Sequence, residues 1–135
     1  MNKTFHLDII TPTSIESFKE ISYLRIPSLD GLIGIKAKHT AAIIGISVGE
    51  IKITANGKDK IYSTSGGFID IKSEGVQLLI ESVELSQTID QNRAQVSLSR
   101  AQNHLKDPTM NIQRAEKAIK RAKNRLALYK KYHNQ

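Results

Sequence analysis

Hydrophobic and polar residues alternate in short runs along the chain up to about residue 89. Phe5, Leu7 and Ile9 alternate with polar residues, the period-two pattern of a half-buried strand, and Pro12 ends that run. Residues 23–26 give a second short strand with the same character. The first part of the chain is therefore expected to be built from strands.

The clearest local signal is a pair of apolar runs around Asn56-Gly57, a dipeptide suited to the positive φ values of a type I′ hairpin turn. Gly34 interrupts residues 31–39, which we expect to form an irregular loop. Further strands are expected at 44–48, 68–71 and 76–80. Many short strands without intervening helices predict a β-sandwich of antiparallel sheets, or a flattened barrel.

The periodicity becomes helical after residue 89. Two apolar stripes with spacings of three and four residues predict an antiparallel helical hairpin, in which Asp107-Pro108 ends the first helix and Asn111 caps the second. Thr88 and Gln91 resemble a capping box before the first helix. The stripes are Ala94, Leu98, Ala101 and Leu105, then Ile112, Ala115, Ile119, Ala122, Leu126 and Tyr129.

Composition limits the classes of protein that fit. The chain has 135 residues, 39% of them hydrophobic, and no cysteine, which excludes a disulfide framework and thiolate metal sites. It has no apolar run of about 18 residues, and an acid, Asp8, lies where a signal peptide would need an apolar core. We therefore expect a cytosolic chain or one peripheral to a membrane.

Charge is distributed unevenly along the chain. Residues 1–89 contain nine Lys/Arg and ten Asp/Glu, whereas residues 90–135 contain eleven Lys/Arg and three acids, a balance of +8. Such asymmetry predicts an anionic partner for the second part: nucleic acid, a phosphorylated ligand, a lipid headgroup or an acidic protein surface.

Catalysis has little support in the sequence. The four histidines are scattered without metal-ligand spacing, so no metal site is expected. Ser65-Gly66-Gly67 lacks the Lys-Ser/Thr of a phosphate-binding loop and is better explained as a tight turn. We interpret the protein as non-catalytic.

The residues best suited to bind a ligand lie at and after residue 89, where the helical periodicity begins. Asp90 and Arg93 are three apart and share a helix face, although an Asp opening a helix also serves as an ordinary N-cap. If the hairpin closes, Arg93, Arg100, Arg121 and Arg125 could converge near Asp90, an arrangement that fits a nucleoside polyphosphate, with Asp90 or Glu84 accepting from a hydroxyl or amino group. From the residues alone, the favoured interpretation is the alternative, that these arginines point into solvent or pair with a partner's acids.

The chain resembles the epsilon subunit of bacterial F-type ATP synthases. The resemblance rests on residues 5–12, on residues 65–68 and on the arginine-alanine repeats of the hairpin. It implies a β-sandwich at residues 1–86 that binds the gamma subunit and the membrane c-ring, and a helical hairpin at 87–135. Such a hairpin either folds against the sandwich or extends along gamma into the catalytic alpha/beta head, where it inhibits ATP hydrolysis. The implied protein is a non-catalytic rotor subunit on the cytoplasmic face of the bacterial plasma membrane, which couples proton translocation to ATP synthesis.

The resemblance also implies sites. The family's ATP-binding motif matches Ile89, Asp90, Arg93 and Ala94, its further arginines match Arg100, Arg121 and Arg125, and its acid matches Glu84. It implies ATP as a regulatory ligand, without a tightly bound cofactor and with no requirement for Mg²⁺ that the sequence shows. The loop implied to approach the c-ring contains Gly31, Leu32 and His39, with Leu32 in place of the usual glutamate and Ala37 in place of a proline.

A second hypothesis is a nucleic-acid-binding module that uses the basic hairpin. Aromatic residues that could stack on bases do not interleave with its basic residues before Tyr129 and Tyr132. We therefore expect no nucleic-acid partner.

Overall fold

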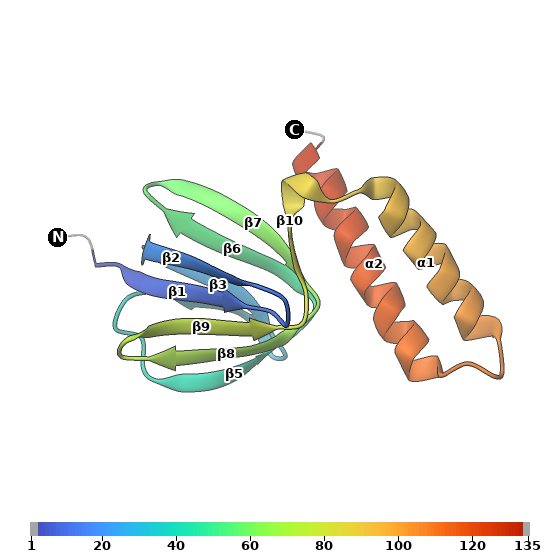
Figure 1. Cartoon of the computed structure of the whole chain (residues 1–135), viewed down its shortest axis with the longest axis horizontal. Coiled ribbons are helices and arrows are strands. Elements are labelled where there is room, and N and C mark those ends of the chain that lie inside the picture. The colour runs from blue at the N-terminus through green and yellow to red at the C-terminus, as the bar shows by residue number, and fades with distance from the viewer. Residues whose placement is uncertain (1–2, 134–135) are drawn as a thin grey trace. The chain divides into compact units, whose positions relative to one another are not determined.

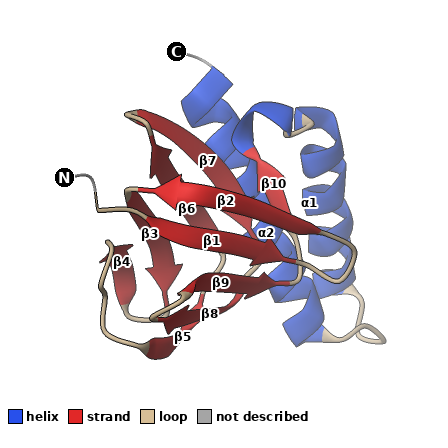
Figure 2. Ribbon diagram, turned by 60° about the vertical axis from the view of Figure 1, so that its left-hand side comes forward, coloured by secondary structure: helices blue, strands red, loops and turns tan. Residues whose placement is uncertain are grey.

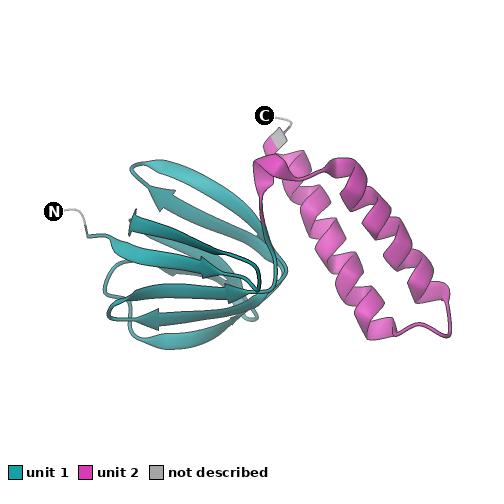
Figure 3. Ribbon diagram, in the orientation of Figure 1, with its two compact units in different colours: residues 1–83 teal, residues 84–135 magenta. Residues whose placement is uncertain are grey.

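The computed structural model describes residues 3–133 and contains two compact units, Met1–Val83 and Glu84–Gln135 (Figure 3). We call them the sandwich unit and the hairpin unit. Each is described by itself below. None of the described helices is both long enough and apolar enough to cross a membrane.

The sandwich unit is a sheet that curls so that one of its faces encloses the core (Figures 1 and 2). From β7 the strands run in the order β7-β6-β3-β5-β8-β9-β1-β2, and β4 pairs with β3. The pairs are antiparallel except for β1 and β9, which are parallel. The strands are β1 (Phe5–Ile10), β2 (Ile15–Ile21), β3 (Tyr23–Ser28), β4 (Gly31–Ile35), β5 (Ala42–Ile46), β6 (Gly49–Ala55), β7 (Lys58–Thr64), β8 (Gly67–Lys72) and β9 (Gly75–Ile80).

Aliphatic side chains from almost every strand fill this core, because alternate residues of each strand point to the enclosed face. Burying such side chains is the main stabilising contribution to a domain of this size. The predicted fold class, a β-sandwich followed by a helical hairpin, is confirmed. The largest fully buried side chains are Leu7, Ile9, Ile21, Leu24, Ile26, Ile35, Ile51, Ile53, Ile69, Leu78 and Thr64.

The predicted turn at Asn56-Gly57 is confirmed. Asn56 has φ 53° and Gly57 has φ 72°, and Ala55 pairs with Lys58 across the turn. Both central residues therefore have the positive φ that a type I′ turn requires. This turn fixes the register of β6 and β7.

The expected loop at residues 31–39 is wrong in its first half, where β4 pairs with β3 from Gly31 to Ile35. Gly34 does not break the strand. A Cβ atom there would lie 2.6 Å from the Tyr23 hydroxyl oxygen, so glycine allows the tyrosine ring to pack on the strand. The interruption seen in the sequence is thus a packing requirement.

The hairpin unit begins with the end of β10 (Val83–Leu85) and a 3₁₀ turn, η1 (Ser86–Thr88). Two antiparallel helices follow, α1 (Gln91–Lys106) and α2 (Ile112–His133) (Figure 1). As predicted, α1 ends before Asp107-Pro108, and Asn111 Oδ1 accepts a hydrogen bond from the Arg114 backbone N–H at 3.1 Å. Because Asn111 lies just before the first helical residue, this bond is an N-cap of α2.

The predicted stripes form the contact between the helices over only part of their length. Ala94, Leu98, Ala101, Ala115 and Ala122 are buried. Near the turn, Leu105 and Ile112 are exposed, at 40% and 55%. Small side chains let two helices approach closely but bury little apolar area.

Candidate functional site

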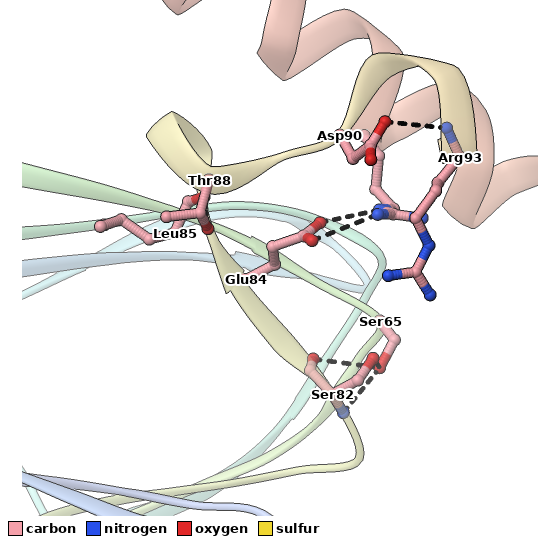
Figure 4. Close-up of polar contacts among 8 residues, drawn as sticks. Ser65, Ser82, Glu84, Leu85, Thr88, Asp90 and Arg93 are labelled. Atoms are coloured by element: carbon pink, nitrogen blue, oxygen red, sulfur yellow. Dashed lines mark hydrogen bonds and ion pairs between the residues drawn. The ribbon is translucent and has the colours of Figure 1, made fainter. Parts of the chain in front are cut away.

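Asp90 begins the first helix of the hairpin unit and is its N-cap. Its Oδ1 accepts a hydrogen bond from the Arg93 backbone N–H at 3.0 Å, and its carbonyl accepts from the Ala94 N–H at 3.0 Å (Figure 4). The capping box expected from Thr88 and Gln91 is wrong, because the Thr88 hydroxyl donates instead to the Leu85 carbonyl at 2.8 Å. The Asp90 side chain is exposed, so its carboxylate is accessible from solvent as well as capping the helix.

Ile89 and Ala94 lie on either side of this cap and are buried, at 4% and 0% exposure. Neither side chain presents a polar atom to a ligand. Their packing anchors the first turn of α1 and thereby fixes the position of the exposed Asp90 and Arg93 side chains.

Glu84 and Arg125 form a bidentate ion pair within the hairpin unit. Arg125 Nε donates to Glu84 Oε1 at 2.8 Å, and Nη2 donates to Oε2 at 3.2 Å (Figure 4). The Arg125 side chain is 25% exposed and the Glu84 side chain 32%, so both are partly shielded from water. The pair ties the segment before α1 to the second half of α2, and it brings together two residues that the sequence predicts for one site.

The arginines of the hairpin follow a simple rule. Arg93, Arg100, Arg114 and Arg121 each come one residue before an alanine that is buried between the helices: Ala94, Ala101, Ala115 and Ala122. One residue is a rotation of about 100° around a helix axis, and the sense is the same in all four cases. In an antiparallel helix pair, residues that are rotated in the same sense along their chains away from the contact lie on the same side of the pair. The four arginines therefore share one side of the hairpin.

A groove on this side provides independent support for that placement. It has a volume of about 440 Å³ and is lined by Arg100, His104 and Ser97 of α1 together with Arg114 and Ala118 of α2. Side chains of both helices thus meet in one concave surface. Since α1 and α2 run in opposite directions, Arg93 lies toward the Arg121 and Arg125 level, and Arg100 toward the Arg114 level.

Arg114 is the residue that sequence reasoning missed. It follows the same arginine-alanine pattern as the three predicted arginines, and it lines the groove together with Arg100. The signal was therefore present in the sequence, as the position of each arginine relative to the buried alanines. Among the described residues, no group of three acids or histidines is placed to hold a metal ion.

The three residues predicted for a c-ring contact lie in the sandwich unit and do not form one cluster. Gly31 and Leu32 begin β4, and Leu32 is 66% exposed. His39 lies beyond the other end of that strand, where its Nδ1 donates to the Thr40 carbonyl at 2.8 Å. The length of β4 separates them by about 13 Å.

Comparisons with known proteins agree over residues 4–130. Residues 4–86 match the family described as ATP synthase, Delta/Epsilon chain, beta-sandwich domain, and residues 87–130 match its long alpha-helix domain. An ATP synthase epsilon chain of Desulforamulus reducens is 33% identical, with 93% of this chain and 97% of the relative covered. One of Bacillus pumilus is 31% identical, with 92% and 95% covered.

Two solved structures share the fold. A chain of the Euglena gracilis mitochondrial ATP synthase superimposes with a TM-score of 0.80 at 18% identity, covering 94% of this chain and 81% of that one. A chain of the Tetrahymena thermophila mitochondrial ATP synthase, from its central stalk and c-ring, gives a TM-score of 0.61 at 14% identity, with 96% of each chain covered.

Proposed function

The chain belongs to the ATP synthase delta/epsilon chain family, and on that premise we propose that it is a non-catalytic rotor subunit in the central stalk of an F-type ATP synthase. The observation that carries the proposal is the match of both domains, in order, to relatives named ATP synthase epsilon chain. In this role the protein transmits rotation driven by proton translocation to ATP synthesis. It acts as a peripheral subunit on the cytoplasmic face of the plasma membrane.

The sandwich unit is the proposed attachment to the rotor. It binds the gamma subunit and the c-ring, and the exposed Leu32 and His39 are candidates for the c-ring contact. Because these residues lie at opposite ends of β4, the contact would have to span that strand or use one end of it. Co-purification of the chain with gamma on a sizing column tests the attachment, and separate elution of the two proteins would contradict it.

The hairpin unit is the proposed regulatory element. When extended along gamma into the alpha/beta head, it inhibits ATP hydrolysis. ATP binds the closed hairpin, in which arginines of both helices line one side. Arginine forks donate to phosphate oxygens, while Asp90 and Glu84 accept from a ribose hydroxyl or the adenine amino group.

The regulation follows from differential affinity. Helices that separate carry Arg93 and Arg100 away from Arg121 and Arg125, so the open hairpin loses the shared anion site. A ligand that binds one conformation stabilises it by RT ln(1 + [L]/Kd), and ATP therefore favours the closed hairpin. High ATP concentration thus relieves inhibition by withdrawing hairpins from the head.

A pair of caps provides the test of this site. Asp90 and Asn111 make the same capping bond, at 3.0 Å and 3.1 Å, at the starts of α1 and α2. Replacing either with Ala removes a cap worth about 1 kcal/mol. Calorimetry with ATP should show binding weakened by about tenfold or more in Asp90→Ala, because a charge-assisted hydrogen bond is lost as well.

Asn111→Ala is the control for loss of a cap. Asn111 lines the groove at the opposite end of the hairpin from Asp90, so this variant should change ATP affinity by no more than about twofold. Equal weakening in both variants would mean that Asp90 acts only as a cap. Arg121→Ala should weaken ATP binding in the same experiment, and unchanged binding in that variant would place the phosphates elsewhere.

A further inference from the structure

One end of the sandwich unit contains a pocket of about 740 Å³ that is lined by five lysines. We call it the lysine pocket. Strand register explains how it forms around the β8–β9 turn. Ala42 pairs with Ile71, and Leu7 pairs with Val76, so the segments that precede Ala42 and Leu7 lie on either side of that turn. The five lysines are Lys3, Lys19, Lys36, Lys38 and Lys72.

The charge of the pocket differs from the charge of its unit. Residues 1–89 contain nine Lys/Arg and ten Asp/Glu, yet five of those nine basic residues line the pocket. Glu74 is the one acid of the ten that lines it. Even with Asp70 at 3.5 Å from Lys72 Nζ, the pocket keeps an excess of positive charge. Like charges gathered in one concavity repel each other unless an anion is bound.

The backbone holds two of these lysines in place. Lys36 and Lys38 lie in a turn closed by a hydrogen bond from the His39 N–H to the Lys36 carbonyl at 3.3 Å. Lys38 has φ 65°, a left-handed conformation that costs energy for a residue with a Cβ atom. On the other side of the pocket, a Cβ atom on Gly75 would lie 3.1 Å from the His6 carbonyl oxygen, so the start of β1 approaches the β8–β9 turn closely.

We propose that the lysine pocket binds a phosphate group that carries two or more negative charges. Lysine ammonium groups act as point charges on flexible stems. They can therefore follow the several oxygens of a phosphate, and such a ligand suits the pocket better than a carboxylate does. The volume lies in the range of small-molecule sites. Such a group can come from a soluble phosphorylated compound or from the headgroup of an acidic phospholipid.

This site is separate from the hairpin arginines, because all its lining residues belong to the sandwich unit. Its failure would leave the proposed role of the hairpin unchanged. The lysine pocket assigns an anionic ligand to the sandwich unit, although the nearly neutral charge of residues 1–89 does not indicate such a ligand.

Residue-resolved NMR of the full chain with pyrophosphate tests the soluble source. The amide resonances of Lys36, Lys38 and Gly75 should shift during the titration. The double variant Lys19→Gln/Lys36→Gln should raise the apparent Kd obtained from these shifts by about tenfold, because two of the five positive charges are removed. Following individual amides separates this site from any binding at the hairpin.

The matched control is Lys58→Gln/Lys60→Gln, which removes the same charge from the β6–β7 hairpin outside the pocket. It should change the apparent Kd by no more than about twofold. Equal weakening in the two double variants would reduce the effect to net charge and overturn the proposal.

Flotation with vesicles tests the lipid source. Vesicles containing phosphatidic acid, whose headgroup is a phosphate monoester that can carry two charges, should carry the chain, and those of phosphatidylcholine alone should not. The pocket variant should float about tenfold less than the control variant. Binding that depends on Lys19 and Lys36, in either the pyrophosphate titration or the flotation, supports the pocket and identifies the source of its phosphate ligand. The absence of pocket-dependent binding in both arms overturns it.

Discussion

The sandwich unit and the hairpin unit are stabilised in different ways. Among the described residues, the sandwich unit buries large aliphatic side chains such as Leu24, Ile51 and Leu78 at 0% exposure. In the hairpin unit, four of the seven buried hydrophobic residues are alanines. An alanine contributes far less buried apolar area than a leucine, so the contact between the helices is much weaker than the core of the sandwich.

Charge accentuates this difference. In the hairpin unit, Arg125 pairs with Glu84 at 2.8 Å, but Arg93, Arg100, Arg114 and Arg121 gather on one side of the helices. In the sandwich unit, Arg25 pairs with Glu50 at 2.9 Å. In the proposed function, a weak contact combined with like charges on one side suits an element that a bound anion stabilises in its closed form, because packing contributes little to that stability. The strongly packed unit can then serve as a fixed attachment.

Leu24→Ala should have the largest effect on stability. Leu24 is fully buried near the start of β3, and truncating such a side chain costs about 2–5 kcal/mol through lost burial and a residual cavity. Urea unfolding followed at amide resonances of β6 measures the loss. Leu79→Ala, which removes a 42% exposed leucine, should cost about 1 kcal/mol or less. Equal losses would contradict the division between core and surface.

Ala94→Leu should act on the hairpin alone and more moderately. Ala94 is 0% exposed between the helices, and a larger side chain there forces them apart at a cost of about 1–3 kcal/mol. Amide hydrogen exchange should speed up in α1 and α2 and stay unchanged in the sandwich strands. Gln95→Leu, at an exposed neighbouring position, is the control. Unchanged exchange in the Ala94 variant would mean that the alanine contact does not hold the hairpin closed.

Much of this fold could be predicted because its signals are local. The turn at Asn56-Gly57, the end of α1 before Asp107-Pro108 and the cap at Asn111 all depend on residues within a few positions of each other. The strand β2, at Ile15–Ile21, was not predicted. It is an edge strand that pairs only with β1, and only Ile21 of its residues is buried, so it lacks a period-two pattern.

The sites divide in the same manner. The placement of Arg93, Arg100 and Arg121 on one side of the hairpin follows from helical spacing, and Arg114 could have been included by the same rule. The Glu84–Arg125 pair joins residues 41 positions apart. The resemblance assigned both residues to one site, but neither it nor any local pattern predicted that they pair. The lysine pocket gathers segments from the start of β1, from β2, from the β4–β5 loop and from the β8–β9 turn. Only strand register brings those lysines together, and register was not readable from the sequence.

The smallest expected effect concerns the turn between the two helices of the hairpin. Asp107 Oδ1 accepts hydrogen bonds from the Thr109 hydroxyl at 2.7 Å and from the Thr109 N–H at 2.9 Å. The hydroxyl bond first and the backbone bond second lower the pKa of the Asp107 carboxyl below its ordinary 3.8. Because the folded-state pKa is lowered, this carboxylate stabilises the turn above pH 3.8, and the contribution is lost as pH falls through the lowered value.

Carboxyl NMR titration of Asp107 should therefore give a midpoint below pH 3.8. Thr109→Val removes the hydroxyl donor and keeps the backbone N–H, so the pKa should rise toward 3.8 without reaching it. Thr88→Val is the control, since the Thr88 hydroxyl donates to a carbonyl elsewhere in the hairpin unit. A midpoint that does not move in Thr109→Val would show that the backbone bond alone orders this turn. The Thr109 hydroxyl would then contribute nothing to the connection between the helices, and the bond from the Thr109 N–H to the Asp107 carboxylate would remain as its ordering contact.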